Sequence, residues 1–318
     1  MDLDLFSSSS NEPLFDKEDK TLTKKEVVAQ KSKRRKTEMD RKEQNKEEIL
    51  KSCIEYFKGD TLAADVWINK YALRDGNKVY ELNPDEMHRR LAREFARIEH
   101  KYKNPLSEDD IYELLKDFKY IIPQGSPMAG IGNNFQVVSL SNCFVIGNPA
   151  NSDSYGGILK IDQEQVQLMK RRGGVGHDLS HIRPKMSPVK NSALTSTGIV
   201  PFMERYSNTT KEVAQGGRRG ALMLSISIKH PDAEDFIDAK MELNKITGAN
   251  VSVKIDDEFM RCVVSGKPYK QQFPINSDNP SVIKEIDARE LWKKIIHNAW
   301  QSAEPGVLFW DTIIRESV

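Results

Sequence analysis

The stretch that decides the fold is residues 221–255, ALMLSISIKHPDAEDFIDAKMELNKITGANVSVKI. Its two outer runs, 221–228 and 249–255, are short and rich in β-branched and other apolar residues, which predicts strands. The run between them, 232–240, has the spacing of an amphipathic helix. Strand, helix and strand alternating at these lengths predict an α/β domain with parallel strand connections.

The same alternation continues on both sides of this stretch, so we predict that the α/β domain extends over 121–318. A pair that resembles a capping box, Asp287 with Glu290, opens the last long helix. Further strands are expected over 135–146, 269–275 and 307–310, and further helices over 157–171, 201–214, 256–264 and 288–303.

Upstream, residues 48–120 have helical periodicity and predict a separate helical domain. Asn83 before Pro84 predicts one helix start, and Ser107 with Asp110 predicts a second as a capping box. The apolar stripes expected to face the core are Met87, Leu91, Phe95 and Ile98 on the first helix, and Ile111, Leu114, Leu115 and Phe118 on the second.

The charge balance excludes a global polyanion-binding field, because 48 Lys and Arg face 47 Asp and Glu. Residues 1–47 are dominated by charged and polar side chains and predict a disordered tail. Its basic run, 31–36, fits a nuclear signal or a nucleic-acid contact, but a solvated tail is the favoured interpretation. Without a long apolar run or a basic leader, we expect a cytoplasmic protein with no membrane or nucleic-acid partner.

Three well-separated cysteines, Cys53, Cys143 and Cys262, exclude a disulfide scaffold and argue against a structural zinc site. Cys53 and Cys262 lie on apolar helix faces and are expected to be inert core residues. Cys143 lies instead on a predicted strand, between Asn142 and Phe144. It is either a thiol that faces a polar cavity and does redox chemistry, or a small core residue, and both interpretations stay open.

Three glycine-rich stretches, 125–130, 171–176 and 215–220, stand out as turns. The second and third also carry paired arginines, which suits phosphate recognition. Their spacing matches neither GxGxxG nor GxxxxGK[ST], which excludes a Rossmann or P-loop site. Taken by spacing alone, they are more simply ordinary turns than nucleotide loops.

Six motifs in a fixed order give a more specific indication, and over 48–318 the chain resembles the large catalytic subunit of ribonucleotide reductase. Its nearest likeness is the bacterial adenosylcobalamin-dependent branch. The resemblance implies an α/β fold in which a helical N-terminal region is followed by the first half of a ten-stranded α/β barrel. The motifs are SPMAGIG at 126–132, SLSNCFV at 139–145, SDSYGGI at 152–158, RRGGVGHDLSHIRP at 171–184, QGGRRGALML at 215–224 and HPDAEDFI at 230–237.

The resemblance also implies roles for individual residues. Cys143 matches the first cysteine of the pair that reduces the 2′-carbon of the ribonucleotide. Residues matching the substrate site are Ser126, Asn142, Gly173 and Gly174, and those matching the site for a deoxynucleoside triphosphate effector are Asp153, Ser154, Arg183, Gln215, Arg219 and Gly220.

The implied reaction is the reduction of ribonucleotides to 2′-deoxyribonucleotides by thiyl-radical chemistry, with adenosylcobalamin, a thioredoxin-like reductant and a homodimeric enzyme. The family's radical-cysteine motif, Asn-Pro-Cys-Gly-Glu, does not occur in these 318 residues, and the second reducing cysteine is missing too. We therefore expect a partner chain carrying the C-terminal catalytic half, and no turnover by this chain alone. The rival interpretation is a non-catalytic nucleotide-binding regulatory or assembly module. A weaker rival, an RNA-associated protein, is disfavoured by the neutral charge and the lack of an RNP-like aromatic motif.

Overall fold

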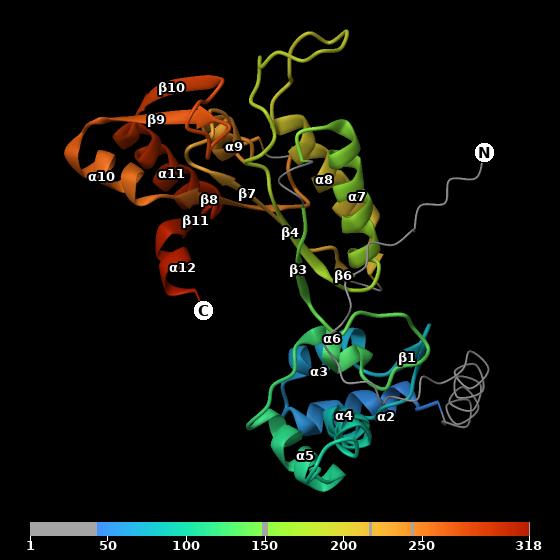
Figure 1. Ribbon diagram of the computed structural model, residues 1–318. Helices are drawn as coiled ribbons and strands as arrows, with labels where there is room; N and C mark the ends of the chain where they lie inside the picture. Colours follow the sequence, from blue (N-terminus) through green and yellow to red (C-terminus); the bar gives the residue numbers. More distant parts are fainter. Residues whose placement is uncertain (1–42, 148–151, 216–217, 243–244, 318) are drawn as a thin grey trace. The chain divides into compact units, whose positions relative to one another are not determined.

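The computed structural model describes residues 43–147, 152–215, 218–242 and 245–317 (Figure 1). The predicted tail, with its basic run, lies outside the described residues as far as Lys42. The first described helix, α2, covers Lys46–Tyr56 and so begins two residues before the predicted start of the helical domain.

The helical region contains four helices of eight or more residues among those described, and its helix starts are as predicted. Asn83 accepts hydrogen bonds from the first-turn amides of α4, and Ser107 and Asp110 form a reciprocal capping box at α5. The elements are α2, α3 (Thr61–Lys70), the hairpin β1 (Arg74–Asp75) and β2 (Lys78–Val79), α4 (Pro84–Glu99), α5 (Glu108–Leu115) and the 3₁₀ turn η1 (Lys116–Phe118).

One predicted apolar stripe is only half correct. Met87 and Leu91 are buried, but Phe95 and Ile98 are exposed. The buried face of α4 also takes in a row of smaller or polar residues at four-residue spacing, namely His88, Ala92 and Ala96. The buried face of α4 is therefore rotated toward this row and away from Phe95 and Ile98.

A five-stranded parallel sheet confirms the α/β prediction. Its strands are β3 (Cys143–Val145), β4 (Gly174–Asp178), β7 (Leu222–Ser227), β8 (Asn250–Ile255) and β11 (Gly306–Phe309). They lie in the order β11-β8-β7-β4-β3. Each strand of this sheet therefore pairs with the strand of the sheet that precedes or follows it in the sequence, and all four pairings are parallel. The expected half of a barrel corresponds to this set of five strands.

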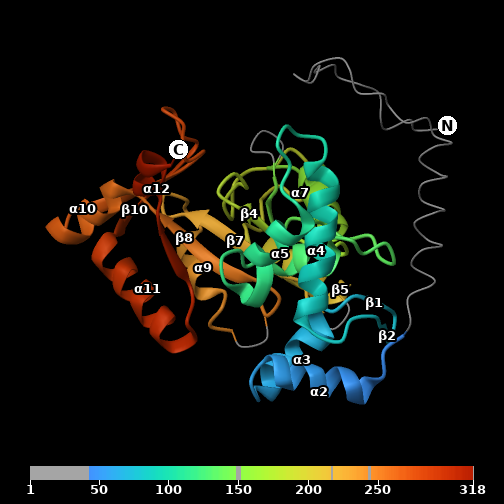
Figure 2. The ribbon, with the colours of Figure 1, turned by 90° about the horizontal axis from the view of Figure 1, so that it is seen from below.

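Helices cover one face of the sheet (Figures 1 and 2). Alternate residues of β7 and β8 point into the core beneath them, with Leu224 and Val253 fully buried. Within this layer α7 packs against α8 and β4, and α9 packs against β7, β8 and α11. The helices are α7 (Tyr155–Met169), α8 (Val200–Glu212), α9 (Ala233–Asp238), α10 (Asp257–Ser265) and α11 (Ala288–Ser302).

The intervening residues of the same strands line a cavity of about 770 Å³ on the other side. Its polar core is Asp178, whose carboxylate accepts hydrogen bonds from Ser180 (2.7 Å) and Ser225 (3.2 Å) and pairs with the ammonium of Lys254 (2.7 Å). One face of the sheet is therefore apolar and covered, and the other carries polar side chains.

Several predicted strands and turns are wrong in detail. The strand expected over 135–146 is reduced to β3, because Ser139 hydrogen-bonds to the backbone of Ser141 and replaces ladder bonds with a local turn. The glycine-rich stretch 125–130 is a short helix, α6 (Gly125–Gly130). In the stretch 171–176, β4 begins at Gly174, where a Cβ atom would lie 3.2 Å from the Asn142 carbonyl oxygen of the neighbouring strand.

The strand expected over 269–275 does not join the parallel sheet. It forms β9 (Pro268–Phe273), which pairs antiparallel with a strand that was not predicted, β10 (Val282–Asp287). Around the third glycine-rich stretch, the backbone forms a two-stranded pair, β5 (Ala214–Gln215) with β6 (Arg218–Arg219). The helix α12 (Trp310–Glu316) was also not predicted.

Candidate functional site

Cys143 is the first residue of β3 and is exposed, so the alternative that it is a small core residue is wrong. It stands opposite Gly174 in the parallel register of β3 and β4. A glycine on the neighbouring strand leaves the space beside the thiol free of a side chain. The thiol is thus accessible at the amino end of the sheet.

Four other residues predicted for the substrate site gather around Cys143. The Ser126 amide donates to Asn142 Oδ1 (2.8 Å), and the Ser126 hydroxyl donates to the carbonyl of Arg172 (3.3 Å), directly before Gly173. A Cβ atom on Gly173 would come within 2.9 Å of the Phe144 ring. We call Ser126, Asn142, Cys143, Gly173 and Gly174 the amino-edge cluster.

Within the amino-edge cluster, exposure is unequal. Ser126, Gly173 and Gly174 are buried, Asn142 is half-buried and Cys143 is exposed. The buried members therefore fix the backbone around the site, and Asn142 and Cys143 present the accessible polar atoms.

The other two cysteines lie elsewhere and are engaged. The Cys53 thiol is fully buried in the helical region and donates to the Leu82 carbonyl (3.1 Å), and burial raises its pKa to about 12. Cys262 is half-buried on α10, packs against the core of the α/β region and donates to the Pro268 carbonyl (3.5 Å). Neither belongs to the amino-edge cluster. The expected core position is confirmed for Cys53, whereas Cys262 lies only half-buried at the margin of the core.

A second site is a pocket of about 490 Å³ that brings together Asp153, Ser154 and Arg183, three residues predicted to bind an effector. Ser154 caps α7, its hydroxyl accepting from the amide of Gly157 (3.0 Å). The Arg183 guanidinium pairs with Asp153 through Nε at 2.9 and 3.0 Å and through Nη2 at 2.9 Å. The two residues expected to recognise different parts of a nucleotide thus bind each other in this structure.

The lining of this Asp153 pocket is chemically mixed. It offers two cations for phosphate, one carboxylate and several hydroxyls for a sugar, and an apolar wall. Besides the three residues above, it includes Lys190, Asn191, Thr195, Ser196 and Thr197, and the apolar side chains Ile158, Ile182, Val189 and Phe202.

The residues that hold the loop around this pocket, His230 and Asp232, were not predicted to belong to a site. His230 is buried, accepts from the Asp232 amide (3.0 Å) and its other ring nitrogen lies 2.8 Å from the Ile182 carbonyl. The Asp232 carboxylate accepts from the amides of Lys185 (2.9 Å) and Ile199 (3.4 Å), so it ties the two ends of loop 183–199 together. Burial raises the pKa of Asp232. The motif HPDAEDFI was the available signal, but its spacing does not show which loop it contacts.

Of the segment 215–220, Gly220 is described with its surroundings, and it does not line the Asp153 pocket. Gly220 precedes β7 at the amino end of the sheet and lines a different cavity, with Thr210 and Asn250 among its neighbours. Loop 183–199, in contrast, follows the carboxyl end of β4. Gln215 and Arg219 belong to the β5–β6 pair, and the structure describes their backbone only.

Among the residues that the structure describes, no group of three or more His, Cys, Asp or Glu side chains is arranged to hold a metal ion. In the same residues, no helix has the length and apolar character needed to cross a membrane.

Comparison with known proteins identifies both regions. The description "Ribonucleotide reductase, barrel domain" matches residues 141–318, and "Ribonucleotide reductase, all-alpha domain" matches 57–133. The vitamin B12-dependent ribonucleoside-diphosphate reductase of Thermoplasma acidophilum is 36% identical over 180 residues, which is 56% of this chain and 23% of that protein. The enzyme of the same name from Mycobacterium tuberculosis is 29% identical over 258 residues, 80% of this chain and 36% of that protein.

A third relative, the ribonucleoside-diphosphate reductase subunit alpha of Helicobacter pylori, is 26% identical over 284 residues, covering 81% of this chain and 35% of that protein. The chain thus spans between about a quarter and just over a third of the length of these relatives. Because the barrel-domain match alone covers more than half of the chain and the five parallel strands lie within it, this protein belongs to the ribonucleotide reductase family.

Proposed function

We propose that this chain contributes the helical region and the Cys143 side of the active site to a ribonucleotide reductase that converts ribonucleotides to 2′-deoxyribonucleotides. The observation that carries the proposal is the exposed thiol of Cys143 in the amino-edge cluster, beside the half-buried amide of Asn142 and opposite Gly174. An accessible thiol is free to react, whereas Cys53 is buried with a raised pKa.

The chemistry needs two thiols for each turnover. The 2′-hydroxyl leaves as water, the 2′-carbon gains a hydrogen, and two thiols become one disulfide, which a thioredoxin-like dithiol then reduces. Cys143 supplies one of the two. Cys53 and Cys262 lie outside the amino-edge cluster, so the second thiol and the radical cysteine come from residues that complete the barrel.

Adenosylcobalamin is the proposed source of the unpaired electron, in keeping with the names of two relatives, which are vitamin B12-dependent. The cavity on the open face of the sheet is lined by charged side chains such as Asp178, Lys254 and Arg261, which do not suit the broad apolar surface of a corrin ring. We assign none of these residues to the cofactor.

The Asp153 pocket is the proposed site for a deoxynucleoside triphosphate effector. Arg183 would exchange the Asp153 carboxylate for a phosphate oxygen, which frees Asp153 to accept from a sugar hydroxyl. The apolar wall at Ile158 and Phe202 suits a base. We propose that Gln215, Arg219 and Gly220 link this site to the substrate, and that the working enzyme is a cytoplasmic homodimer.

Peptide mapping of a single turnover tests the role of Cys143. The chain is combined with a polypeptide that carries the remaining part of the barrel domain, and with adenosylcobalamin and a ribonucleoside diphosphate, but no external reductant. We expect a disulfide between Cys143 and a cysteine of the added polypeptide. Cys143→Ser should abolish multiple turnover and leave folding and effector binding intact.

Cys262→Ser is the matched control, because it makes the same atomic change at a half-buried thiol outside the amino-edge cluster. It should retain turnover. Unimpaired turnover by Cys143→Ser, or a disulfide through Cys53 or Cys262, would overturn the assignment. Effector binding without any turnover by the assembled chains would instead favour a regulatory nucleotide-binding module.

A further inference from the structure

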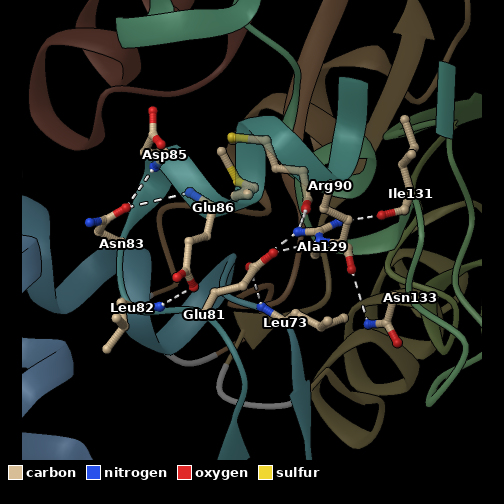
Figure 3. A network of polar contacts seen from close by, with 12 residues as sticks. Leu73, Glu81, Leu82, Asn83, Asp85, Glu86, Arg90, Ala129, Ile131 and Asn133 are labelled. Carbon is tan, nitrogen blue, oxygen red and sulfur yellow. Dashed lines mark hydrogen bonds and ion pairs between the residues drawn. The ribbon is translucent and has the colours of Figure 1, made fainter. Parts of the chain in front are cut away.

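A buried ion pair in the helical region, outside the amino-edge cluster, joins Arg90 and Glu81 (Figure 3). The Arg90 guanidinium donates from Nε to Glu81 Oε1 (2.7 Å) and from Nη2 to Glu81 Oε2 (3.3 Å). Both side chains are only 4% exposed. Glu81 Oε2 also accepts from the Leu73 amide (2.8 Å), so the carboxylate is fixed from two directions.

The same guanidinium binds backbone carbonyls at the carboxyl end of the short helix α6. Arg90 Nη1 donates to the Ile131 carbonyl, and Nη2 donates to the Met128 carbonyl (2.8 Å). The carbonyls between these two are engaged by Asn133, whose side chain donates to Ala129 (3.0 Å) and whose amide donates to Gly130 (3.1 Å). The last carbonyls of α6 are therefore satisfied, half of them by Arg90.

Backbone geometry shows how closely this end of α6 approaches Arg90. Gly132 has a left-handed φ of +70°, and a Cβ atom there would lie 2.9 Å from Cγ of Arg90. A side chain at this position would be strained and would also collide with the arginine. The chain that leaves α6 is thus folded directly onto the Arg90 side chain.

The other end of α6 carries Ser126, a buried member of the amino-edge cluster, which bonds to Asn142 and to the Arg172 carbonyl. A helix of six residues has too few internal hydrogen bonds to persist without tertiary support. Polar contacts hold both of its ends, Ser126 with Asn142 at one and Met128 and Ile131 with Arg90 at the other. The side chains of Met128 and Ile131 also pack against the core of the helical region.

We propose that Arg90, oriented by Glu81, is a positioning residue for ribonucleotide binding: it holds the carboxyl end of α6 and thereby fixes Ser126 and the Asn142 side chain beside Cys143. This inference rests on the proposed function for its ligand. Arg90 does not itself contact the substrate, and its effect is transmitted through the backbone of α6.

The test uses Arg90→Lys, which keeps the positive charge next to Glu81 but loses the planar fork that reaches two carbonyls and a carboxylate at once. Amide hydrogen exchange of the 318-residue chain should become at least about tenfold faster over 125–131 and stay unchanged in α5. In the enzyme assembled with the rest of the barrel domain, the KM for a ribonucleoside diphosphate should rise about tenfold while kcat stays within about twofold.

Arg93→Lys is the matched control, because Arg93 lies on the same helix in an exposed pair with Glu108 (3.7 Å). It should change neither exchange nor KM. Ile111→Ala controls for general loss of stability, since it removes a buried side chain from α5. It should lower Tm and leave the KM unchanged.

A second variant, Asn133→Ala, loosens the same end of α6 and leaves the buried ion pair intact. It should give a smaller change in the same direction, about two- to threefold, so the inference stays testable where Arg90→Lys fails to fold. Unchanged exchange over 125–131, an unchanged KM despite faster exchange, or an equal KM effect of Ile111→Ala would overturn the positioning role. If the unmodified assembly reduces no ribonucleotide, the proposed function is wrong, and so is the ribonucleotide part of this inference. The hydrogen-exchange result still decides whether Arg90 holds α6.

Discussion

At the scale of single residues, the pairing of Arg183 with Asp153 shapes what the Asp153 pocket can do. Each side chain is about one third exposed and satisfies the other's charge. A ligand must therefore bring both an anion for Arg183 and a hydrogen-bond donor for Asp153 to displace the pair without leaving a charge unpaired. A nucleotide, with phosphate at one end of a hydroxylated sugar, meets both conditions.

Charge reversal tests this directly. Arg183→Glu should weaken deoxynucleoside triphosphate binding roughly ten- to a hundredfold, because a charge-assisted hydrogen bond contributes about 1.5–3 kcal/mol. Isothermal titration calorimetry measures the change. Lys185→Glu is the control: Lys185 is an exposed residue of the same loop that does not line the pocket, and its replacement makes the same change in charge. Equal affinities for Arg183→Glu and the unmodified chain would sink the site assignment.

At the scale of elements, the carboxylate of Asp232 joins the two ends of loop 183–199 by accepting from the amides of Lys185 and Ile199. Gly198 lies directly beside this carboxylate. Gly198 has φ of +79°, and a Cβ atom there would lie 2.7 Å from Asp232 Oδ2 and 2.9 Å from Lys185 Cβ. The close approach and the left-handed backbone both require glycine. The loop that walls the Asp153 pocket is thus pinned where its two ends meet.

Gly198→Ala should therefore destabilise the fold by more than about 1 kcal/mol and lower effector affinity, since a non-glycine residue is strained at this φ and crowded by Asp232 and Lys185. Urea denaturation and calorimetry provide the two measurements. Gly156→Ala, on the exposed side of α7 with open space around its Cβ position, is the control and should be neutral or stabilising. A neutral Gly198→Ala would show that the loop ends move apart at little cost.

Two buried histidines make the stability of the α/β region depend on pH. Burial lowers the pKa of His177 on β4 and of His230 before α9 to about 4, against about 6.5 in the unfolded chain. Between these values the unfolded chain binds more protons than the folded one. The stabilisation is therefore complete above pH 6.5 and is lost as the pH falls toward 4.

Each histidine should cost about 2 kcal/mol of unfolding free energy on going from pH 7 to pH 5. His177→Gln should remove its share of that loss, which urea denaturation at the two pH values detects. His100→Gln, an exposed position at the end of α4, is the control and should leave the difference as it is in the unmodified chain. A pH dependence unaltered by His177→Gln would mean that the ring does not stay neutral in the fold.

At the scale of the whole molecule, the sheet ends in two edges. Within the described residues, β3 and β11 each pair on one side only. Apolar side chains lie exposed at both, with Val145 on β3 and Phe309 on β11, followed by Ile313 and Ile314 on α12. Unpaired backbone groups beside exposed apolar surface favour association with another chain.

We expect the 318-residue chain to self-associate with rising concentration, and sedimentation velocity measures this. Val145→Lys and Ile314→Lys should shift the distribution toward monomer, because a charge on an edge opposes pairing. Val264→Lys, at an exposed position near the carboxyl end of α10, should not. A polypeptide that completes the barrel domain should suppress association by covering the same edges. Self-association that only Val264→Lys reduces would place the contact elsewhere.

Features that depend on a few neighbouring residues could be predicted from the amino-acid sequence. Asn83, Ser107 and Asp287 act within one turn of their own helices, so their caps were predictable, although Asp287 receives only the two amides of Arg289 and Glu290 without the reciprocal contact of a full box. The strands at 222–227 and 250–255 were likewise readable from their short runs of β-branched and other apolar residues. The six ordered motifs identified the family for the same reason, since they need no three-dimensional information.

Tertiary structure alone decided which segments meet. The fold exposes the Cys143 side chain and pairs β9 with β10 outside the parallel sheet. It also brings Arg183 to Asp153, and Arg90 to Glu81 and α6. The partners in these contacts are separated by between nine and about forty residues, and each contact forms only because the fold brings the two backbones together. No local propensity encodes such a distance, which is why the Arg90 contact with α6 has no counterpart in the motifs.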